Sequence, residues 1–143
     1  MRKLLQQTTL TVLAIVFFVL TTFSQTATQP AGSGTEQDPY QIETLDHLYW
    51  LAITNSAWDK HFIQIANIDA TPTSGWDNDS GFTPIALGPG FDGTYNGKGH
   101  SIDGLYINRP NHDYLALFVY NNNGSKIDSL SVINVNISGI DMY

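Results

Sequence analysis

The sequence contains no cysteine among its 143 residues. Small exported domains are commonly held together by disulfides, so a disulfide-stapled scaffold is excluded for this chain. The same absence excludes a lipid-modified amino-terminal cysteine and a cysteine nucleophile. Packing between side chains, a metal ion or a partner must therefore stabilise the fold.

Basic residues are also scarce. After residue 24 only four remain against 13 Asp and Glu, which gives a formal net charge of −9. The four are Lys60, Lys98, Arg109 and Lys126. Nucleic acids are bound through clustered Lys and Arg that release counterions from phosphates, and four scattered cations cannot form such a cluster. The balance argues against a nucleic-acid partner and disfavours anionic membrane surfaces.

Long hydrophobic runs are confined to the amino terminus. Arg2 and Lys3 precede an apolar run from Leu10 to Leu20, and hydroxylated residues follow up to Ser24. This order predicts a signal peptide over residues 1–24, cleaved after Ser24. The run is shorter than the roughly 20 residues that a spanning helix needs, although an uncleaved anchor remains the alternative. We therefore expect a secreted or cell-surface protein with no stable membrane anchor after cleavage.

The remainder divides into a lead-in and one domain. Residues 25–35 are small, polar and rich in turn formers, which predicts a flexible lead-in. Residues 36–143 have the length of a single domain. One helix is predicted from Leu45 to Ser56, with Thr44 as its N-cap and leucines on one face. The later part is predicted to consist of strands, among them Ser101–Asn108, Tyr114–Tyr120 and Lys126–Asn134.

A 25-residue repeat is indicated by four positions that recur at one constant offset. They are Ile102, Asp103, Leu105 and Ile107, which recur as Ile127, Asp128, Leu130 and Val132. An offset in the twenties, on short strands separated by Asn and Gly turns, is typical of a stacked β-solenoid. The predicted fold is therefore mainly β, a right-handed parallel β-helix or solenoid with one short N-terminal helix. A β-sandwich of hairpins is the alternative, because its short strands give a similar pattern.

A solenoid also needs a polar cap on its last coil, because each coil buries its apolar face on a neighbour. Residues Gly139–Tyr143 do not have the composition of such a cap. We therefore expect the domain at 36–143 to be incomplete at its C-terminus. It would then be part of a longer protein or a unit that docks onto another chain.

Three segments carry a resemblance to a known family. They are GSGTEQDPYQI (Gly32–Ile42), ANIDA (Ala66–Ala70) and FDGTYNGKGHSIDGLYIN (Phe91–Asn108). These resemble the amino-terminal part of secreted and surface proteins with GLUG motifs, common among Bacteroidetes-like bacteria. Where such proteins show Gly-Leu-Phe-Gly this chain has Ala116–Val119, so the glycines are replaced. The resemblance implies a β-helical, surface-exposed architecture and no particular chemistry.

A calcium site is one candidate function of the acidic loops. Asp77 and Asp79, followed by Gly81, are similar to the start of a calcium loop, in which alternate oxygens converge on one ion. Asp69 could complete the site from a neighbouring segment. The alternative interpretation is a solvated acidic loop. No other cofactor is suggested by the sequence.

Aromatic residues provide a candidate for sugar binding. Trp76, Tyr95 and Tyr106 could form a platform on which a glycan stacks, and surface glycans or other proteins would then be the partners. The alternative is that these rings pack in the core, which is the commoner use of large aromatics.

An enzymatic function has little support. Asp103 and Asp128 would lie about 4.8 Å apart if the repeat placed them on adjacent strands, close enough to shift a pKa. However, the sequence has no Gly-x-Ser-x-Gly elbow and no His-x-x-x-His zinc pair. We therefore expect a non-catalytic structural or adhesive module. The alternatives are a carbohydrate-binding module and the N-terminal segment of a larger secreted sugar-processing enzyme or peptidase.

Overall fold

The computed structural model describes residues 25–139, so the predicted signal peptide at 1–24 lies outside the described residues. Within this range the chain forms nine short strands, one α-helix and two 3-10 turns. The elements are β1 (Tyr40–Ile42), α1 (Leu45–Ile53), η1 (Asn55–Ala57), β2 (His61–Gln64), β3 (Ile68–Asp69), η2 (Thr71–Gly75), β4 (Thr94–Asn96), β5 (Ser101–Asp103), β6 (Tyr106–Asn108), β7 (Lys126–Asp128), β8 (Ser131–Ile133) and β9 (Asn136–Ser138).

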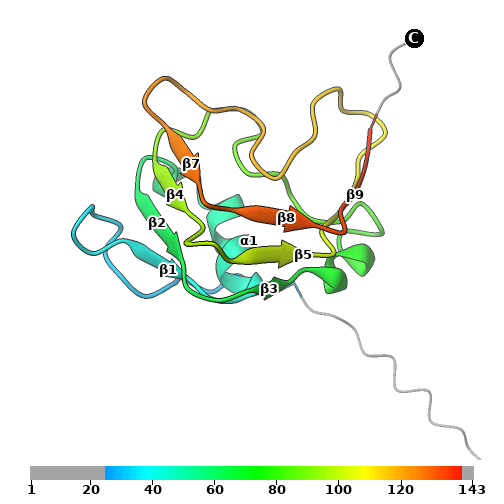
Figure 1. Cartoon of the computed structure of the whole chain (residues 1–143). Helices are drawn as coiled ribbons and strands as arrows, with labels where there is room; N and C mark the ends of the chain where they lie inside the picture. The colour runs from blue at the N-terminus through cyan, green and yellow to red at the C-terminus, as the bar shows by residue number, and fades with distance from the viewer. Residues whose placement is uncertain (1–24, 140–143) are drawn as a thin grey trace, which may run out of the picture.

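The strands form three small sheets, with orders β1-β2-β4-β7, β3-β5-β8 and β6-β9 (Figure 1). Every strand pair in them is parallel. A sandwich made of hairpins would pair its strands antiparallel, so the β-sandwich alternative does not fit the described strands. The prediction of a mainly β domain with one short N-terminal helix is confirmed.

From β4 onward, consecutive strands belong to the first, second and third sheets in turn, and β7 belongs to the first sheet again. β4, β5 and β6 are consecutive, and each pairs with the matching member of β7, β8 and β9. Tyr95 therefore aligns with Ile127, and Ile102 aligns with Val132. The predicted 25-residue repeat is wrong, because it matched Ile102 of the second sheet with Ile127 of the first.

Sharp corners divide stretches that the sequence predicts as single strands. Ser101–Asn108 is broken at Gly104, which has a φ of 75°. Lys126–Asn134 is broken at Ser129, with a φ of 52°. A positive φ turns the backbone out of extended geometry and leads the chain from one sheet to the next. Asn134, with a φ of 50°, occupies the corner that Gly104 occupies one layer earlier.

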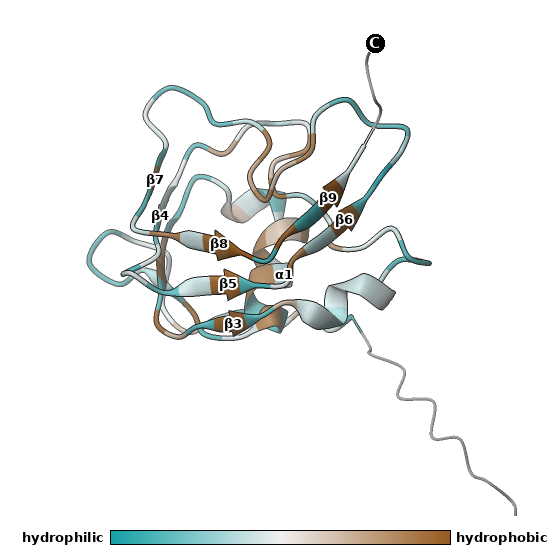
Figure 2. Cartoon of the chain, turned by 45° about the vertical axis from the view of Figure 1, so that its right-hand side comes forward, coloured by the Kyte–Doolittle hydropathy of each residue, from teal (hydrophilic) through white to brown (hydrophobic). Residues whose placement is uncertain are grey.

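The core consists of columns of aligned apolar side chains. Ile68, Ile102 and Val132 occupy matching positions on β3, β5 and β8. Figure 2 shows hydrophobic colour recurring on these three strands and on β6 and β9. Ile107 aligns with Ile137 in the same manner. Parallel strands in register place such side chains about 4.8 Å apart, so each layer buries the layer before it.

Helix α1 begins where the sequence predicts. The backbone N–H of His47 donates to the Thr44 hydroxyl at 3.3 Å, which satisfies one of the unpaired donors of the first turn. The helix ends at Ile53, before the predicted end at Ser56. The indole N–H of Trp58 donates to the carbonyl of Leu51 at 2.8 Å, so a ring after the helix satisfies a carbonyl of its last turn.

The segment predicted as a flexible lead-in is bonded to the domain along part of its length. The backbone N–H of Thr28 donates to the carbonyl of Asp46 at 3.2 Å. The N–H of Gln41 in β1 donates to the carbonyl of Ala31 at 2.8 Å. Residues before 36 therefore cover the outer edge of β1.

Two long loops, residues 76–93 and 109–125, also contact each other. The predicted strand Tyr114–Tyr120 is not a strand, but it forms an isolated parallel bridge through Phe118 to Ile85. Ile85 donates to the carbonyl of Leu117 at 2.8 Å, and Val119 donates back to Ile85 at 2.9 Å. The loops thus stack on one another with the same direction as the strands.

Close stacking explains the glycine at position 97. A Cβ there would lie 2.6 Å from the Cα of Leu130 in the next layer. We expect Gly97→Ala to reduce the free energy of unfolding by about 1–3 kcal/mol, because the clash is with backbone. Urea denaturation followed by tryptophan fluorescence measures the change.

Gly75→Ala is the matched control, since a Cβ at Gly75 meets nothing within 4 Å. It should change the stability by less than about 0.5 kcal/mol. Equal losses in the two variants would contradict the close approach at Gly97.

Candidate functional site

A groove lies on the outer surface of the sheet β1-β2-β4-β7 and has a volume of about 290 Å³. Its lining combines both charge signs with amide, hydroxyl and apolar groups. The lining residues are Glu36, Pro39, His61, Phe62, Ile63, Thr94, Tyr95, Asn96, Lys126 and Asp128.

The polar side chains of the groove stand in a row because the strands are in register. Alternate residues of a strand point to opposite faces. Phe62 and Tyr95 point into the core and are almost fully buried, so their neighbours point outward. His61, Thr94 and Lys126 are aligned across β2, β4 and β7. Their spacing is about 4.8 Å per strand, the separation of neighbouring strands.

Each polar group of this row bonds to another side chain of the groove. The Nδ1 atom of His61 and the hydroxyl of Thr94 are 2.8 Å apart. Lys126 Nζ is 2.8 Å from Asp128 Oδ2. The hydrogen bond and the charge of Asp128 raise the pKa of Lys126, and the bond from Lys126 lowers the pKa of Asp128. Both groups are therefore charged at neutral pH, and the groove presents a neutralised ion pair to a ligand.

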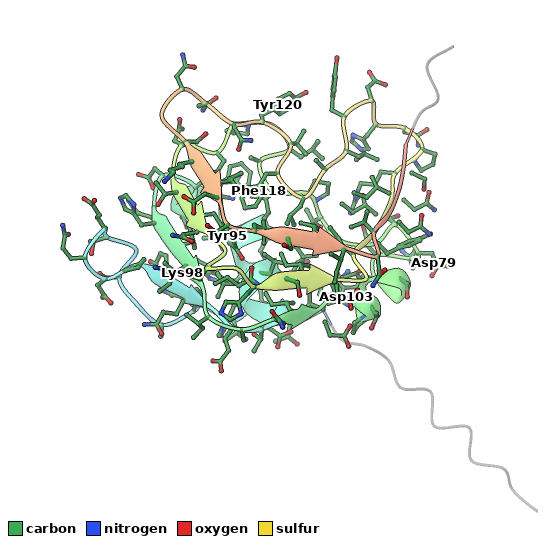
Figure 3. The ribbon with its side chains drawn as sticks, viewed as in Figure 1. Asp79, Tyr95, Lys98, Asp103, Phe118 and Tyr120 are labelled. Carbon is green, nitrogen blue, oxygen red and sulfur yellow. The ribbon has the colours of Figure 1, made fainter. Side chains whose placement is uncertain are left out.

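Two of the three residues predicted to bind sugar are core residues. Trp76 is 2% exposed, and its ring centroid lies 5.2 Å from that of Tyr49. Tyr95 is fully buried, and its hydroxyl donates to Gln64 Oε1 at 3.1 Å. Figure 3 shows Tyr95 close to Phe118, with ring centroids 5.4 Å apart. The predicted platform is wrong for Trp76 and Tyr95, because both rings pack in the hydrophobic core of the domain.

Tyr106, the third residue of that prediction, is partly buried on β6. Its ring lies against Gly81, where an added Cβ would meet Tyr106 Cδ1 at 2.8 Å. It is therefore separated from the groove, which lies on another sheet.

Burial raises the pKa of Tyr95, so this phenol stays protonated and serves as a donor within the core.

The predicted calcium ligands do not come together. Asp77 Oδ2 accepts a hydrogen bond from Arg109 at 3.1 Å. Asp69 Oδ1 accepts from the backbone N–H and the hydroxyl of Thr71, at 2.9 and 2.6 Å. In residues 25–139 no group of three His, Asp or Glu side chains converges as metal ligands. The calcium prediction for Asp69, Asp77 and Asp79 is therefore corrected: Asp69 and Asp77 already bond within the chain.

The predicted pairing of Asp103 with Asp128 is also wrong, because the two lie on different sheets. Asp103 instead aligns with Asp69 on the neighbouring strand. The amide of Asn134 donates to Asp103 Oδ1 at 2.7 Å. Asp69 and Asp103 thus each accept a hydrogen bond from a donor within the chain, from Thr71 and from Asn134 respectively.

Sequence reasoning missed the groove. His61, Thr94 and Lys126 are far apart in the chain, and each begins a short strand. The alternation in HFIQ, TYN and KID could have aligned them, had Tyr95 of β4 been matched with Ile127 of β7.

Comparison with known proteins gives two partial matches. No protein-family model matches the chain, and no solved structure matches it. A halomucin from Haloquadratum walsbyi is 34% identical over 112 residues, 76% of this chain but 1% of that protein. A putative Gly-rich membrane protein from Evansella cellulosilytica is 36% identical over 89 residues, 61% of this chain and 10% of that protein. The chain thus spans a small part of both relatives.

The helices of residues 25–139 are short. None of them has the length and apolar character needed to cross a bilayer.

The core role of Tyr95 can be tested with Tyr95→Phe. Removal of the hydroxyl leaves the buried Gln64 Oε1 without its donor, and we expect a loss of about 1–2 kcal/mol in the free energy of unfolding. Tyr120→Phe is the control, because Tyr120 is 42% exposed and should change stability by less than about 0.5 kcal/mol. Urea denaturation compares the two. No loss in Tyr95→Phe would show that the hydroxyl is not a required partner.

The carboxylate of Asp69, the last residue of β3, should make the stability of the domain depend on pH. The hydroxyl and the backbone N–H of Thr71 lower its pKa below the ordinary value of 3.8. A carboxyl whose pKa is lowered by folding contributes stability above 3.8 and loses it as the pH falls through the folded pKa. Asp69→Asn should therefore lose less stability than the parent between neutral pH and pH values below 3.8. Thermal denaturation at stepped pH measures this, and identical pH profiles would contradict it.

Proposed function

We propose that the chain is a non-catalytic structural module of a secreted or cell-surface protein, built as a parallel β-helix. One observation carries the proposal: β4, β5 and β6 align in register with the parallel strands β7, β8 and β9 of the next layer. Such a fold grows by addition of layers, each of which buries the one before it. A stack of this kind acts as a stalk or an adhesive surface without a catalytic site.

The relatives support a surface location. One is named a halomucin and the other a Gly-rich membrane protein, and this chain matches a small part of each. A match to a short stretch of a much longer protein agrees with a structural unit. Kinship with proteins that carry GLUG motifs is part of the same proposal, and rests on the segments Gly32–Ile42 and Phe91–Asn108.

The electrostatics of the groove favour a non-catalytic role. A general base or nucleophile needs a pKa tuned to its task and a free approach to substrate. In the groove Lys126 and Asp128 neutralise each other, and His61 is bonded to Thr94. Asp103 and Asp128 lie on separate sheets and are not aligned with each other.

Glycan binding in the groove is a second candidate function. The observation that favours it is the row of polar side chains at strand spacing, beside apolar surface from Pro39 and Ile63. A neutral sugar offers hydroxyl groups and an apolar face, and this lining could bind both. Retention of neutral glycans by the parent, and its loss in Thr94→Val but not in Tyr106→Phe on the other sheet, would support this role.

Location is tested by expressing the full chain in a bacterial host with a tag after residue 143. We expect the tag to be found outside the cytoplasm, and intact-mass analysis to give a mature chain that begins at Gln25. The physical reason is that the apolar run over Leu10–Leu20 is shorter than the roughly 20 residues that a membrane-spanning helix needs. A tag that stays in the cytoplasm on a chain beginning at Met1 would contradict the proposal.

A further inference from the structure

A second, smaller pocket lies where the turn after η2 meets the segment that follows β6, and it has a volume of about 150 Å³. Its lining consists of Ser80, Asn108, Arg109, Pro110, Asn111 and His112. No Asp or Glu is among these described lining residues, although acidic residues outnumber basic ones by 13 to four after residue 24. An acidic protein repels anions from most of its surface, whereas this lining offers an arginine and other hydrogen-bond donors. The composition of the pocket therefore favours an anionic ligand.

The pocket lies between layers of the stack. The backbone N–H of Asn108 donates to the carbonyl of Ser80 at 2.9 Å. The backbone N–H of Arg109 donates to the carbonyl of Ser138, in β9, at 2.9 Å. Figure 3 shows Asp79, in the turn before Ser80, on the side of the molecule where Figure 1 shows β9. The walls of the pocket are thus fixed by bonds within the described residues, and they do not depend on an open end of the stack.

Two turns hold these walls in place. Residues 77–79 have φ values of 49°, 50° and 64°, a left-handed run that Asp and Asn tolerate better than most residues. The backbone N–H of Ser80 donates to the carbonyl of Asp77 at 3.0 Å, which closes this turn. On the other wall, the N–H of His112 donates to the carbonyl of Arg109 at 3.0 Å. The polar groups of the pocket are therefore held on fixed backbone before any ligand arrives.

The guanidinium of Arg109 has donors to spare. It carries five N–H groups. Among the described residues its side chain makes one hydrogen bond, from Nη2 to Asp77 Oδ2 at 3.1 Å, and its Nε is buried without a partner. The side chain is 16% exposed, so solvent reaches little of it. Buried donors normally have acceptors. Arg109 therefore has the capacity to bond a further acceptor in the pocket.

A carboxylate fits this arrangement better than a phosphate does. A planar guanidinium pairs with a carboxylate through two parallel N–H···O bonds. Asp77 already offsets part of the charge of Arg109, and no other Lys or Arg lines the pocket. One partly offset cation suits an anion with a single charge, whereas a doubly charged phosphate would need further cations. Ser80 and Asn111 offer hydrogen bonds to hydroxyl groups next to the carboxylate.

We propose that this pocket binds a carboxylate, which the guanidinium of Arg109 holds through two parallel hydrogen bonds. Two kinds of ligand share this chemistry, a uronic acid of a glycan and a small free carboxylate. The site is separate from the groove on the first sheet, with which it shares no lining residue. It adds a binding activity to the structural module and does not rest on glycan binding in the groove.

Nuclear magnetic resonance of the isotope-labelled exported chain tests the proposal. Arg109 is the only arginine after residue 24, so the arginine Nε–H signal of the chain that begins at Gln25 reports on this site alone. Glucuronate, acetate and glucose are titrated in parallel. We expect glucuronate to shift the signal saturably and glucose to leave it unchanged. Tighter binding of glucuronate than of acetate supports a glycan as the source of the carboxylate, and equal binding supports a small free carboxylate. A signal that no carboxylate shifts, or that glucose shifts equally, overturns the proposal.

Variants separate a ligand site from an ion pair that only stabilises the fold. Arg109→Lys should weaken glucuronate binding about tenfold, because a lysine cannot make the paired hydrogen bonds. Asp77→Asn should strengthen it about threefold, because a competing negative charge is removed. Lys60→Gln is the control, since Lys60 pairs with Asp59 and does not line the pocket. Affinities are measured by calorimetry, and backbone amide spectra show whether each variant is folded.

Asn111→Ala keeps the test decisive if Arg109→Lys does not fold. Asn111 is exposed, so its truncation should leave the fold intact and weaken glucuronate binding about threefold. Unchanged affinity in a folded Arg109→Lys variant overturns the proposal. Unchanged affinity in both Asn111→Ala and Asp77→Asn overturns it as well.

Discussion

The structure depends on the alignment of apolar side chains on parallel strands one strand spacing apart. Each side chain of the column Ile68, Ile102 and Val132 is covered by the next, and the degree of burial follows its place in the column. Only a fixed register produces this, because a slip of one residue would bring outward polar residues into the core. Without a disulfide, this stacking provides the main stabilisation of the domain.

Several local features follow from the same constraint. Successive layers lie so close that Gly97 has no space for a Cβ beneath Leu130. At the corner between the second and third sheets, Gly104 and Asn134 both adopt a positive φ in successive layers. Opposite faces of each strand serve different purposes, since Tyr95 fills the core while its neighbour Thr94 bonds His61 in the outer groove. The register thus determines both the core and the groove.

Local elements were predictable from the sequence, whereas the register was not. Thr44 and the leucine spacing located α1, because capping and amphipathicity are local properties. The repeat was misaligned because Asp103 and Asp128 have similar neighbours, although loops of unequal length place them on different sheets. The sequence placed Trp76 in a sugar-binding platform, but the ring is buried in the core. The chain after it turns at Asp77 to Asp79, whose φ values are 49° to 64°.

Engineered disulfides test this register most directly, because the chain has no cysteine of its own. Ser101 and Ser131 are aligned on β5 and β8, and aligned Cα atoms lie about 4.8 Å apart, within the range that a disulfide spans. The account predicts that Ser101→Cys with Ser131→Cys forms an intramolecular disulfide on mild oxidation. It also predicts that Ser101→Cys with Lys126→Cys, the pair that the rejected repeat would align, does not. The opposite result would contradict the alignment on which the fold and the groove depend.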